Sequence, residues 1–205
     1  MRITATRDVS SLSFPLPLFE SIAIADVEHD GERFSIVAGL TETEVAQIKT
    51  YALDESDAQL AMTSDRKRFG EGEYQTWYRK ERTPFALVHN KSGTVAALAW
   101  FGPKPLGRKS MKYLSAEEQQ QDETTLESGN WHTISYRSYG DFRGKGLMKG
   151  FLNYVMDVYS SVIPEVQIWA IVDINNPASA ALARKIGFEK SEEHSDDDHI
   201  VMIRR

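Results

Sequence analysis

Cysteine is absent from this chain of 205 residues. Its absence excludes disulfide bonds, a thiolate nucleophile and every metal site that needs cysteine ligands. Long hydrophobic runs are missing too, since no segment approaches the roughly 20 uninterrupted apolar residues that cross a bilayer. A positive net charge is also missing, because 30 acidic residues outnumber 24 basic ones. This balance argues weakly against a nucleic-acid binder, which would present a basic face. We therefore expect neither a nucleic-acid nor a membrane partner.

The N-terminal segment lacks the basic-then-apolar layout of a signal peptide. Prolines interrupt its apolar tract, and Asp8 and Glu20 bracket that tract. Together with the lack of cysteine, this predicts a cytoplasmic protein. The formal net charge of −6 is compatible with a cationic substrate.

The length of the chain suggests one main domain, and 41% apolar residues can build a sizeable core for it. We expect residues 1–33 to form an N-terminal arm, irregular over residues 1–20, with an extra strand. Residues 34–205 would form a single domain. A long loop is expected over residues 104–130, as a mobile surface loop or as a flap over a pocket.

Local signals predict both strands and helices. Asp30 and Gly31 favour a hairpin turn between two β-prone runs, and Thr41 with Glu44 has the spacing of a capping box that opens a helix. Further strands are expected on both sides of an Asn90–Gly93 turn, at 131–140, at 166–172, from 188 and at the C-terminus, with helices around 74–79, after 146 and from 177. The strand-helix-strand order in the C-terminal half implies a parallel strand pair inside an otherwise antiparallel sheet.

The stretch "DFRGKGLMKG", residues 141–150, combines three glycines and three cations directly before an apolar helix pattern. Glycines at a helix N-terminus let a phosphate approach unpaired backbone N–H groups. The stretch nevertheless fails the dinucleotide fingerprint, because Lys149 stands where the third glycine is required, and it fails the nucleotide-triphosphate loop pattern. Taken alone, it fits a phosphate cradle and an ordinary basic helix start equally well.

A second motif, "NPASAALARKIGF", follows one helix and one strand later. In the first motif, Arg143-x-x-Gly146 matches the Arg/Gln-x-x-Gly-x-Gly/Ala loop of the GCN5-related N-acetyltransferase (GNAT) superfamily. The second motif matches that family's later helix in register at Asn176, Ser179, Leu182, Gly187 and Phe188. The chain therefore resembles this superfamily, firmly over residues 130–205 and by strand order back to residue 34. The resemblance implies an α/β (α+β) fold: a mixed, mostly antiparallel sheet with one splayed parallel strand pair, flanked by helices.

The resemblance also implies acetyl-CoA as the acetyl donor. Its pyrophosphate would lie on the backbone of Gly144, Lys145, Gly146, Leu147, Met148 and Lys149, with added charge from Arg143, Lys145 and Lys149. Its pantetheine arm would pair with the backbone of Tyr136, Arg137 and Ser138, as an added strand does. Asn176 would help to hold the same arm, or would simply cap the helix that Pro177 opens.

Three positions depart from the family pattern. Met148 stands where the family usually has glycine or alanine, so we expect weakened or displaced phosphate binding. Ala183 replaces the tyrosine that protonates the leaving thiolate in many members, which leaves that role to another group or to water. Ile171 stands where some members carry a glutamate base and cannot serve as one.

One catalytic candidate, His132, comes from a comparison with another branch of the family. The histone-modifying members carry a glutamate base eleven residues before the loop arginine, and here that position is His132. A histidine with a pKa near 6.5 is suited to accept a proton from an ammonium near neutral pH. Tyr136 and Tyr139 are proton-donor candidates or packing residues. Asp173, just past a strand end, is a candidate for chemistry or a turn residue.

Two charged clusters have simpler explanations. The tip "EEHSDDDH" contains His194 and could hold a metal, but a solvated hairpin tip explains it better, so we expect no metal. The basic run 65–69 reads as a solvated face, or as a contact for the 3′-phosphate end of the cofactor.

The leading hypothesis is an acetyl-CoA-dependent N-acetyltransferase that acts on a primary amine of a small molecule by direct transfer. A peptide or protein amine as the acceptor is the first alternative, and a CoA-binding module without transfer activity is the second. The oligomeric state stays open between a monomer and a homodimer.

Overall fold

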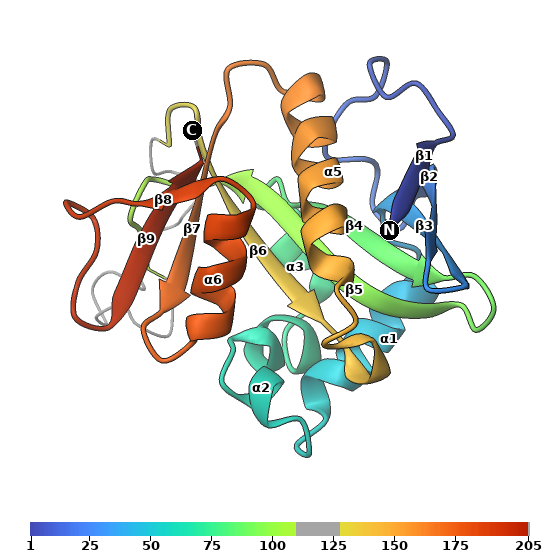
Figure 1. Cartoon of the computed structure of the whole chain (residues 1–205), viewed down its shortest axis with the longest axis horizontal. Coiled ribbons are helices and arrows are strands. Elements are labelled where there is room, and N and C mark those ends of the chain that lie inside the picture. Colours follow the sequence, from blue (N-terminus) through green and yellow to red (C-terminus); the bar gives the residue numbers. More distant parts are fainter. Residues whose placement is uncertain (110–127, 205) are drawn as a thin grey trace. The chain divides into compact units, whose positions relative to one another are not determined.

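The computed structural model describes residues 1–109 and 128–204 (Figure 1). The chain forms two compact units. The first contains residues 1–100 and 136–162, and the second contains residues 101–135 and 163–205. Most of the expected 104–130 loop lies outside the described residues. The expected boundary at residue 33 stays a prediction. Within the described part of the chain, no helix has both the length and the apolar character needed to cross a membrane.

The first unit is built on strands that are hydrogen-bonded in the order β1-β2-β3-β4-β5-β6. Their bounds are β1 Arg2–Ala5, β2 Ser21–His29, β3 Glu32–Gly39, β4 Thr83–His89, β5 Thr94–Pro103 and β6 Trp131–Ser138. Strands β5 and β6 each have residues in both units. The expectation that residues 1–20 are irregular is wrong at β1. Arg2–Ala5 pairs antiparallel with β2, from Arg2 opposite Glu28 to Ala5 opposite Ala25. The sequence carries no local signal for β1, because its extended conformation depends on pairing with β2.

The hairpin between β2 and β3 confirms the turn predicted from Asp30 and Gly31. Both residues have positive φ, 48° and 80°, and the ladder closes with His29 opposite Glu32. This two-residue turn matches the twist of the strands that it joins. It places His29 at the tip of a long hairpin.

The first unit contains the three helices that the sequence predicts, α1, α3 and α5, and short elements that it does not predict. Their bounds are α1 Glu42–Leu53, α2 Ala58–Ala61, α3 Tyr74–Tyr78 and α5 Leu147–Val162, with a π-helical turn η1 at Arg66–Gly70 and a 3-10 turn η4 at Gly140–Phe142. The capping box of α1 is present: Glu44 N–H donates to Thr41 Oγ1 over 3.3 Å, and Thr41 N–H donates to Glu44 Oε2 over 2.7 Å. Ile48 and Ala52 are buried on the inner side of α1.

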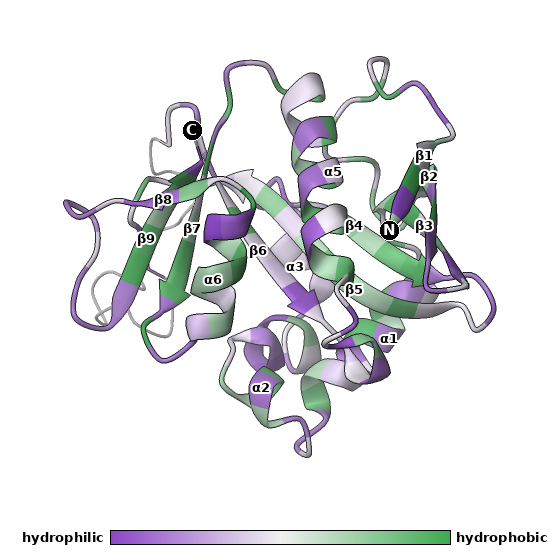
Figure 2. Ribbon diagram, in the orientation of Figure 1, coloured by the Kyte–Doolittle hydropathy of each residue, from purple (hydrophilic) through white to green (hydrophobic). Residues whose placement is uncertain are grey.

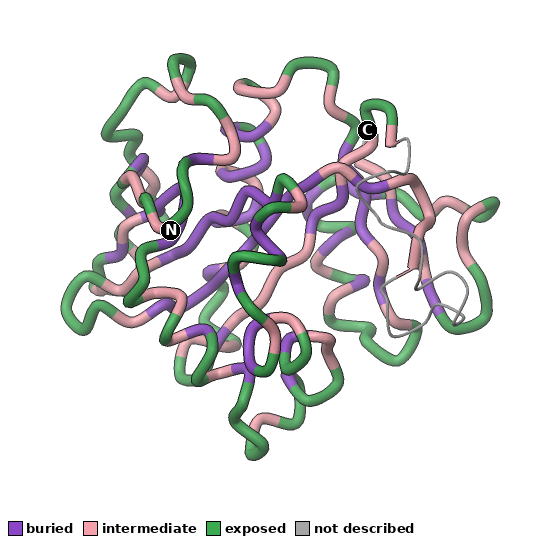
Figure 3. Tube along the Cα trace, turned by 180° about the vertical axis from the view of Figure 1, so that it is seen from behind, coloured by how far each residue is buried: buried purple, intermediate pink, exposed green. Residues whose placement is uncertain are grey.

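Helix α5 carries the strongest amphipathic pattern and buries its apolar side. The buried residues of α5 are Leu147, Phe151, Leu152, Val155, Met156, Val158 and Tyr159. Hydrophilic and hydrophobic residues alternate along α5 in Figure 2. The tyrosine hydroxyl of Tyr154 donates to the Ile24 carbonyl over 3.2 Å, which ties α5 to β2. Buried residues concentrate on the strands and exposed ones on the loops (Figure 3).

The second unit contains the parallel strand pair. Its other elements are β7 Gln167–Asp173, α6 Pro177–Lys185, β8 Phe188–Lys190 and β9 His199–Arg204. β6 and β7 run parallel through three residue pairs, from Trp131 opposite Gln167 to Thr133 opposite Trp169. β9 pairs antiparallel with both β7 and β8. The expected fold class is confirmed: a mixed, mostly antiparallel sheet with one parallel pair and flanking helices.

Candidate functional site

The glycine loop connects β6 to the long helix α5 in the first unit. Gly144 and Gly146 have φ values of 74° and 75°, a conformation that glycine adopts without strain. A Cβ atom at Gly144 would meet nothing within 4 Å, and one at Gly146 would meet only His29 Nε2 at 3.9 Å. The backbone is therefore open to a ligand at the N-terminus of a helix of 16 residues. An open backbone with unpaired N–H groups fits a pyrophosphate.

The Arg143 guanidinium forms an ion pair with Asp57. Its guanidinium donates to both carboxylate oxygens of Asp57, at 2.9 and 2.5 Å, and its Nε donates to the Ser138 carbonyl at 2.8 Å. Burial opposes ionisation of Asp57, but the hydrogen bonds from Arg143 and from the Leu60 N–H outweigh it and hold the pKa of Asp57 below its usual value. Arg143 thus fixes the conformation of the loop more than it adds free charge.

Lys145 and Lys149 keep their charges at the surface. The Lys145 side chain is 44% exposed, with its Nζ 3.9 Å from Glu32 and 5.3 Å from the Phe142 ring centroid. Lys149 is exposed. The Lys145 carbonyl is 2.6 Å from His29 Nε2, so the β2–β3 hairpin supports the loop from one side. No local motif in the sequence pointed to His29.

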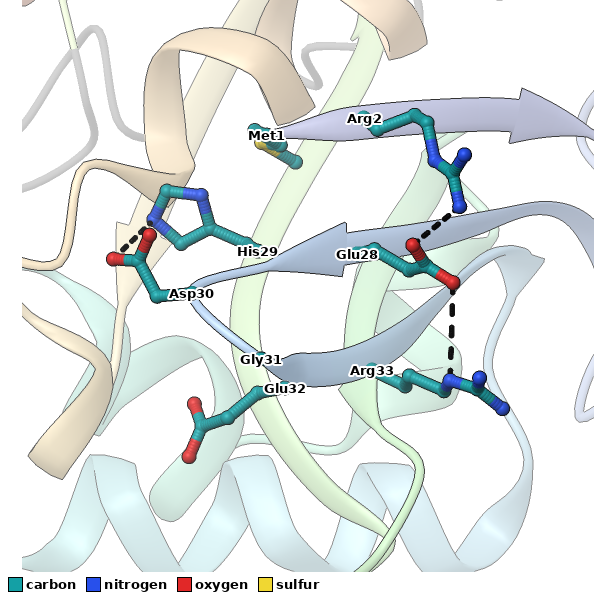
Figure 4. A pocket seen from close by; sticks show the side chains of 8 residues that line it. All are labelled: Met1, Arg2, Glu28, His29, Asp30, Gly31, Glu32 and Arg33. Carbon is teal, nitrogen blue, oxygen red and sulfur yellow. Dashed lines mark hydrogen bonds and ion pairs between the residues drawn. The ribbon is translucent and has the colours of Figure 1, made fainter.

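A cavity of about 490 Å³ lies on this hairpin (Figure 4). It is lined by Met1, Arg2, Glu28, His29, Asp30, Gly31, Glu32 and Arg33. Glu28 forms ion pairs with Arg2 and, at 3.8 Å, with Arg33, while Asp30 lies 3.4 Å from His29 Nε2. Charges of both signs are balanced in this cavity, so it lacks the cationic excess that an anionic ligand requires.

The three residues expected to pair with a pantetheine arm end β6 in the first unit. Arg137 NH1 donates to the Tyr136 carbonyl over 2.7 Å, and the Ser138 carbonyl accepts from Arg143. The Arg137 side chain turns to Asp65, with Nε–Oδ2 and NH2–Oδ1 distances of 2.5 and 2.9 Å.

The basic run 65–69 is a solvated face only in part: Arg66 and Lys67 are exposed, whereas Asp65 and Phe69 are buried. Asp65 is 2% exposed in its side chain and accepts hydrogen bonds from Arg68 and Arg137. Asp65 can be buried because the tertiary structure brings Arg137 of β6 next to it, a charge partner that is distant in the sequence. The contact with the 3′-phosphate end of the cofactor stays a prediction.

His132 and Asp173 lie in the second unit, whereas Tyr136 lies in the first. His132 pairs with Ile168 in the parallel ladder. Asp173 Oδ1 accepts the Asn175 N–H over 2.9 Å, and the Asp173 carbonyl accepts the Asn176 N–H over 2.9 Å. Asp173 therefore acts as a turn residue here, and the catalytic roles of all three residues stay predictions.

The residues of α6 show the capping role that the sequence suggested. Asn176 Oδ1 accepts the Ser179 N–H over 3.0 Å, and Pro177 occupies the first turn of the helix. Ala183 is 1% exposed, so the position that carries a tyrosine in many relatives is packed in the core. Met148 is half-buried in the first turn of α5. A cofactor contact of Asn176 stays a prediction.

The acidic tip brings Asp196, Asp198 and His199 together, with potential ligand atoms within 4.8 Å of one another. Asp196 is already occupied by an ion pair with Lys109 at 2.5 Å, and it accepts the N–H groups of Asp198 and His199. The hydrogen bond from Lys109 is the main cause that lowers the pKa of Asp196. These contacts show that Asp196 stabilises the turn at this tip.

Comparison with known proteins agrees with the fold. The family model described as an acetyltransferase (GNAT) domain matches residues 29–189. The GNAT domain of PAT from S. lividans is 14% identical, covers 87% of this chain and 94% of its own, and superimposes with a TM-score of 0.59. A spermidine N-acetyltransferase chimera from Vibrio cholerae and hSSAT is 14% identical, with 82% and 94% of the two chains covered and a TM-score of 0.52.

The ribosomal-protein-S5-alanine acetyltransferase from Vibrio fischeri is 13% identical, with 87% and 95% of the two chains covered and a TM-score of 0.53. No curated protein matches the sequence at a significant level. At such identities the solved structures establish the fold alone. Because the family model spans well over half of the sequence, the chain belongs to the GNAT family of acetyltransferases.

Proposed function

We propose that this protein transfers an acetyl group from acetyl-CoA to a primary amine of a small molecule. The observation that carries the proposal is the open backbone at Gly144 and Gly146, at the N-terminus of α5. Helix N-termini favour anions because their N–H groups are unpaired and the helix dipole is positive there. Membership of the GNAT family supports the same ligand.

In this proposal the chain's own groups have distinct tasks. The N–H groups of residues 144–149 bind the pyrophosphate, and Lys145 and Lys149 add positive charge. The backbone of residues 136–138 holds the pantetheine arm, with help from Asn176. Bound acetyl-CoA supplies an activated acyl group as a thioester.

The proton transfers fall to side chains that the sequence singled out. His132 accepts the proton of the acceptor ammonium, which frees the nitrogen lone pair for attack. The N–H of Ser138 stabilises negative charge on the carbonyl oxygen during transfer. Attack forms the C–N bond and breaks the C–S bond, and the nitrogen releases its second proton to water. Tyr136 or water returns a proton to the leaving sulfur, because Ala183 has none to give. Asp173 is assigned to orienting the ammonium.

A peptide or protein amine is a second candidate acceptor. It is supported by the position of His132, which corresponds to the base of the histone-modifying members, and by the structural likeness to an acetyltransferase of a ribosomal protein. Thiol release measured with an amine panel and a peptide panel separates the two acceptor classes.

Isothermal titration calorimetry with acetyl-CoA tests the cofactor assignment. We expect binding by the wild type and none by Gly146→Asp, because the new carboxylate faces the pyrophosphate. Gly93→Asp is the matched control, since Gly93 also has positive φ, 66°, and open space around its Cβ position, but lies in the β4–β5 turn. Equal affinity of the two variants would remove the loop assignment. Tight binding without turnover on any acceptor would instead support a non-catalytic CoA-binding module.

A further inference from the structure

A buried group of charges occupies the first unit beside the end of β6. Asp65 precedes the π-helical turn η1, Arg68 lies within that turn, and Arg137 lies on β6. Asp65 Oδ1 is 2.8 Å from Arg68 NH1 and 2.9 Å from Arg137 NH2. We call Asp65, Arg68 and Arg137 the arginine cluster.

Counted over the described residues that pair within it, the arginine cluster has two positive charges and one negative charge. Two guanidinium groups share one carboxylate, and the carboxylate is the more deeply buried: the Asp65 side chain is 2% exposed, against 21% for Arg68 and 20% for Arg137. Burial lowers the pKa of Arg68 to about 10, and Arg137 and Arg82 act in the same direction against the opposing effect of Asp65. The accessible side of the cluster therefore presents net positive charge.

Donors remain available on that side. Within the described part of the chain, Arg68 donates a single hydrogen bond, to Asp65, although a guanidinium carries five N–H groups. The Tyr139 hydroxyl is buried and has no hydrogen-bond partner among the described residues. Tyr139 follows Arg137 by two residues in extended backbone, so the two side chains lie on the same side of the chain. Burial first, and Asp65 second, raise the pKa of Tyr139. An added anionic group could accept hydrogen bonds from donors of these kinds.

Aromatic rings surround these donors. The guanidinium carbons of Arg68 and Arg137 each lie 5.1 Å from the Trp100 ring centroid, and Arg68 lies 5.6 Å from that of Phe69. Tyr51 stacks on Tyr139 with a centroid separation of 4.5 Å. Rings exclude water and strengthen a charge-assisted hydrogen bond. Among the described residues, Asp65 supplies the only carboxylate that pairs with Arg68 or Arg137.

The position of the cluster connects it to the proposed reaction. Arg137 lies between Tyr136 and Ser138, the residues assigned to the pantetheine arm, and it donates to the Tyr136 carbonyl. We propose that the arginine cluster binds a carboxylate of the acceptor, so that the substrate is an amine that also carries a carboxylate, as an amino acid does. This inference rests on the proposed function and adds the acceptor class to it. It disfavours polyamines, whose ammonium groups would meet like charge.

Kinetics with matched acceptors test the inference. The probes are the common amino acids, each compared with its own carboxamide at equal concentration of free amine, and spermidine as the cationic probe. We expect the wild type to favour at least one amino acid over its amide by about 10- to 100-fold in kcat/KM, the value of one charge-assisted hydrogen-bonded contact. Arg68→Gln should remove most of this preference by raising KM for the acid while leaving the amide unaffected.

Arg66→Gln is the matched control, because Arg66 belongs to the same turn η1 but is 47% exposed and pairs with Glu55 and Glu71. It should retain the preference. Tyr139→Phe should raise KM for the acid without lowering the thermal unfolding temperature, since it removes a buried hydroxyl that has no partner in the described structure. A purely structural role of Arg68 would instead reduce turnover of acid and amide equally.

The outcomes separate the inference from the proposed function. Calorimetry with acetyl-CoA on Arg68→Gln should give the wild-type affinity. Preference for amides or spermidine, equal loss with acid and amide, or no turnover of any carboxylate-bearing amine would overturn the inference even if acetyl-CoA binds. Failure of the wild type to bind acetyl-CoA would overturn the proposed function itself.

Discussion

The ion pair between Asp57 and Arg143 should stabilise the first unit measurably, and Asp57→Asn isolates its contribution. Asparagine is also a good N-cap, so the substitution keeps a side-chain acceptor for the N–H groups of Gln59 and Leu60 at the start of α2. What it removes is the negative charge opposite the Arg143 guanidinium.

The expected loss follows from the burial of the pair. Removing one partner of a fully buried ion pair costs roughly 3–5 kcal/mol, and exposed pairs contribute roughly 0–1 kcal/mol. The two side chains, Arg143 and Asp57, are 27% and 13% exposed, so this pair lies between those limits. We expect a loss of about 2 kcal/mol at pH 7, or a urea midpoint lower by about 1 M for an m-value of about 2 kcal/mol/M. Circular dichroism and tryptophan fluorescence would follow the unfolding.

The pH dependence of the free energy of unfolding gives a second, independent test of this ion pair. The pKa of Asp57 is lower in the folded protein, so its carboxylate contributes full stability above its unfolded pKa of about 3.9. That contribution is lost as the pH falls through the lower folded pKa. The difference between wild type and Asp57→Asn should therefore be constant from pH 7 to about pH 5 and should shrink below about pH 4.

Asp54→Asn is the matched control. Asp54 also accepts a local N–H, from Ser56 over 2.9 Å, but it is exposed at the end of α1 and forms no ion pair within the described residues. It should change stability by less than about 0.5 kcal/mol. The reasoning fails if Asp57→Asn behaves like this control at pH 7, or if its deficit persists unchanged at acid pH.

Two further predictions use local features. Thr41→Ala removes the capping box of α1 and should lower the free energy of unfolding in urea by about 1 kcal/mol. Thr50→Ala is the control and should be nearly neutral, because the Thr50 hydroxyl only donates to the Ala46 carbonyl within the same helix. Equal effects of the two substitutions would argue against the cap. His132→Ala should lower kcat by about 100-fold or more in a thiol-release assay while acetyl-CoA affinity stays at the wild-type value, and unchanged turnover would remove His132 as the base.

Much of the fold was predictable because its signals are local. The capping box at Thr41, the turn at Asp30 and Gly31, and the period of α5 each depend on residues a few positions apart. Pairing with a distant edge is not local, so β1 could not be predicted from Arg2–Ala5 alone. The backbone of the glycine loop belongs to the first group, since the positive φ angles of Gly144 and Gly146 follow from residue type and position.

The sequence by itself therefore determined the family, the order of most strands and helices, and the position of the glycine loop before α5. Only the tertiary structure decided which charges are available there. Arg143 is paired with Asp57 across 86 residues, and Arg137 with Asp65 across 72 residues. Such pairs form when folding buries two side chains together, because a buried charge without a partner is too costly to keep. Local motifs describe backbone conformation well, whereas the net charge of a site depends on partners that the chain brings from far away.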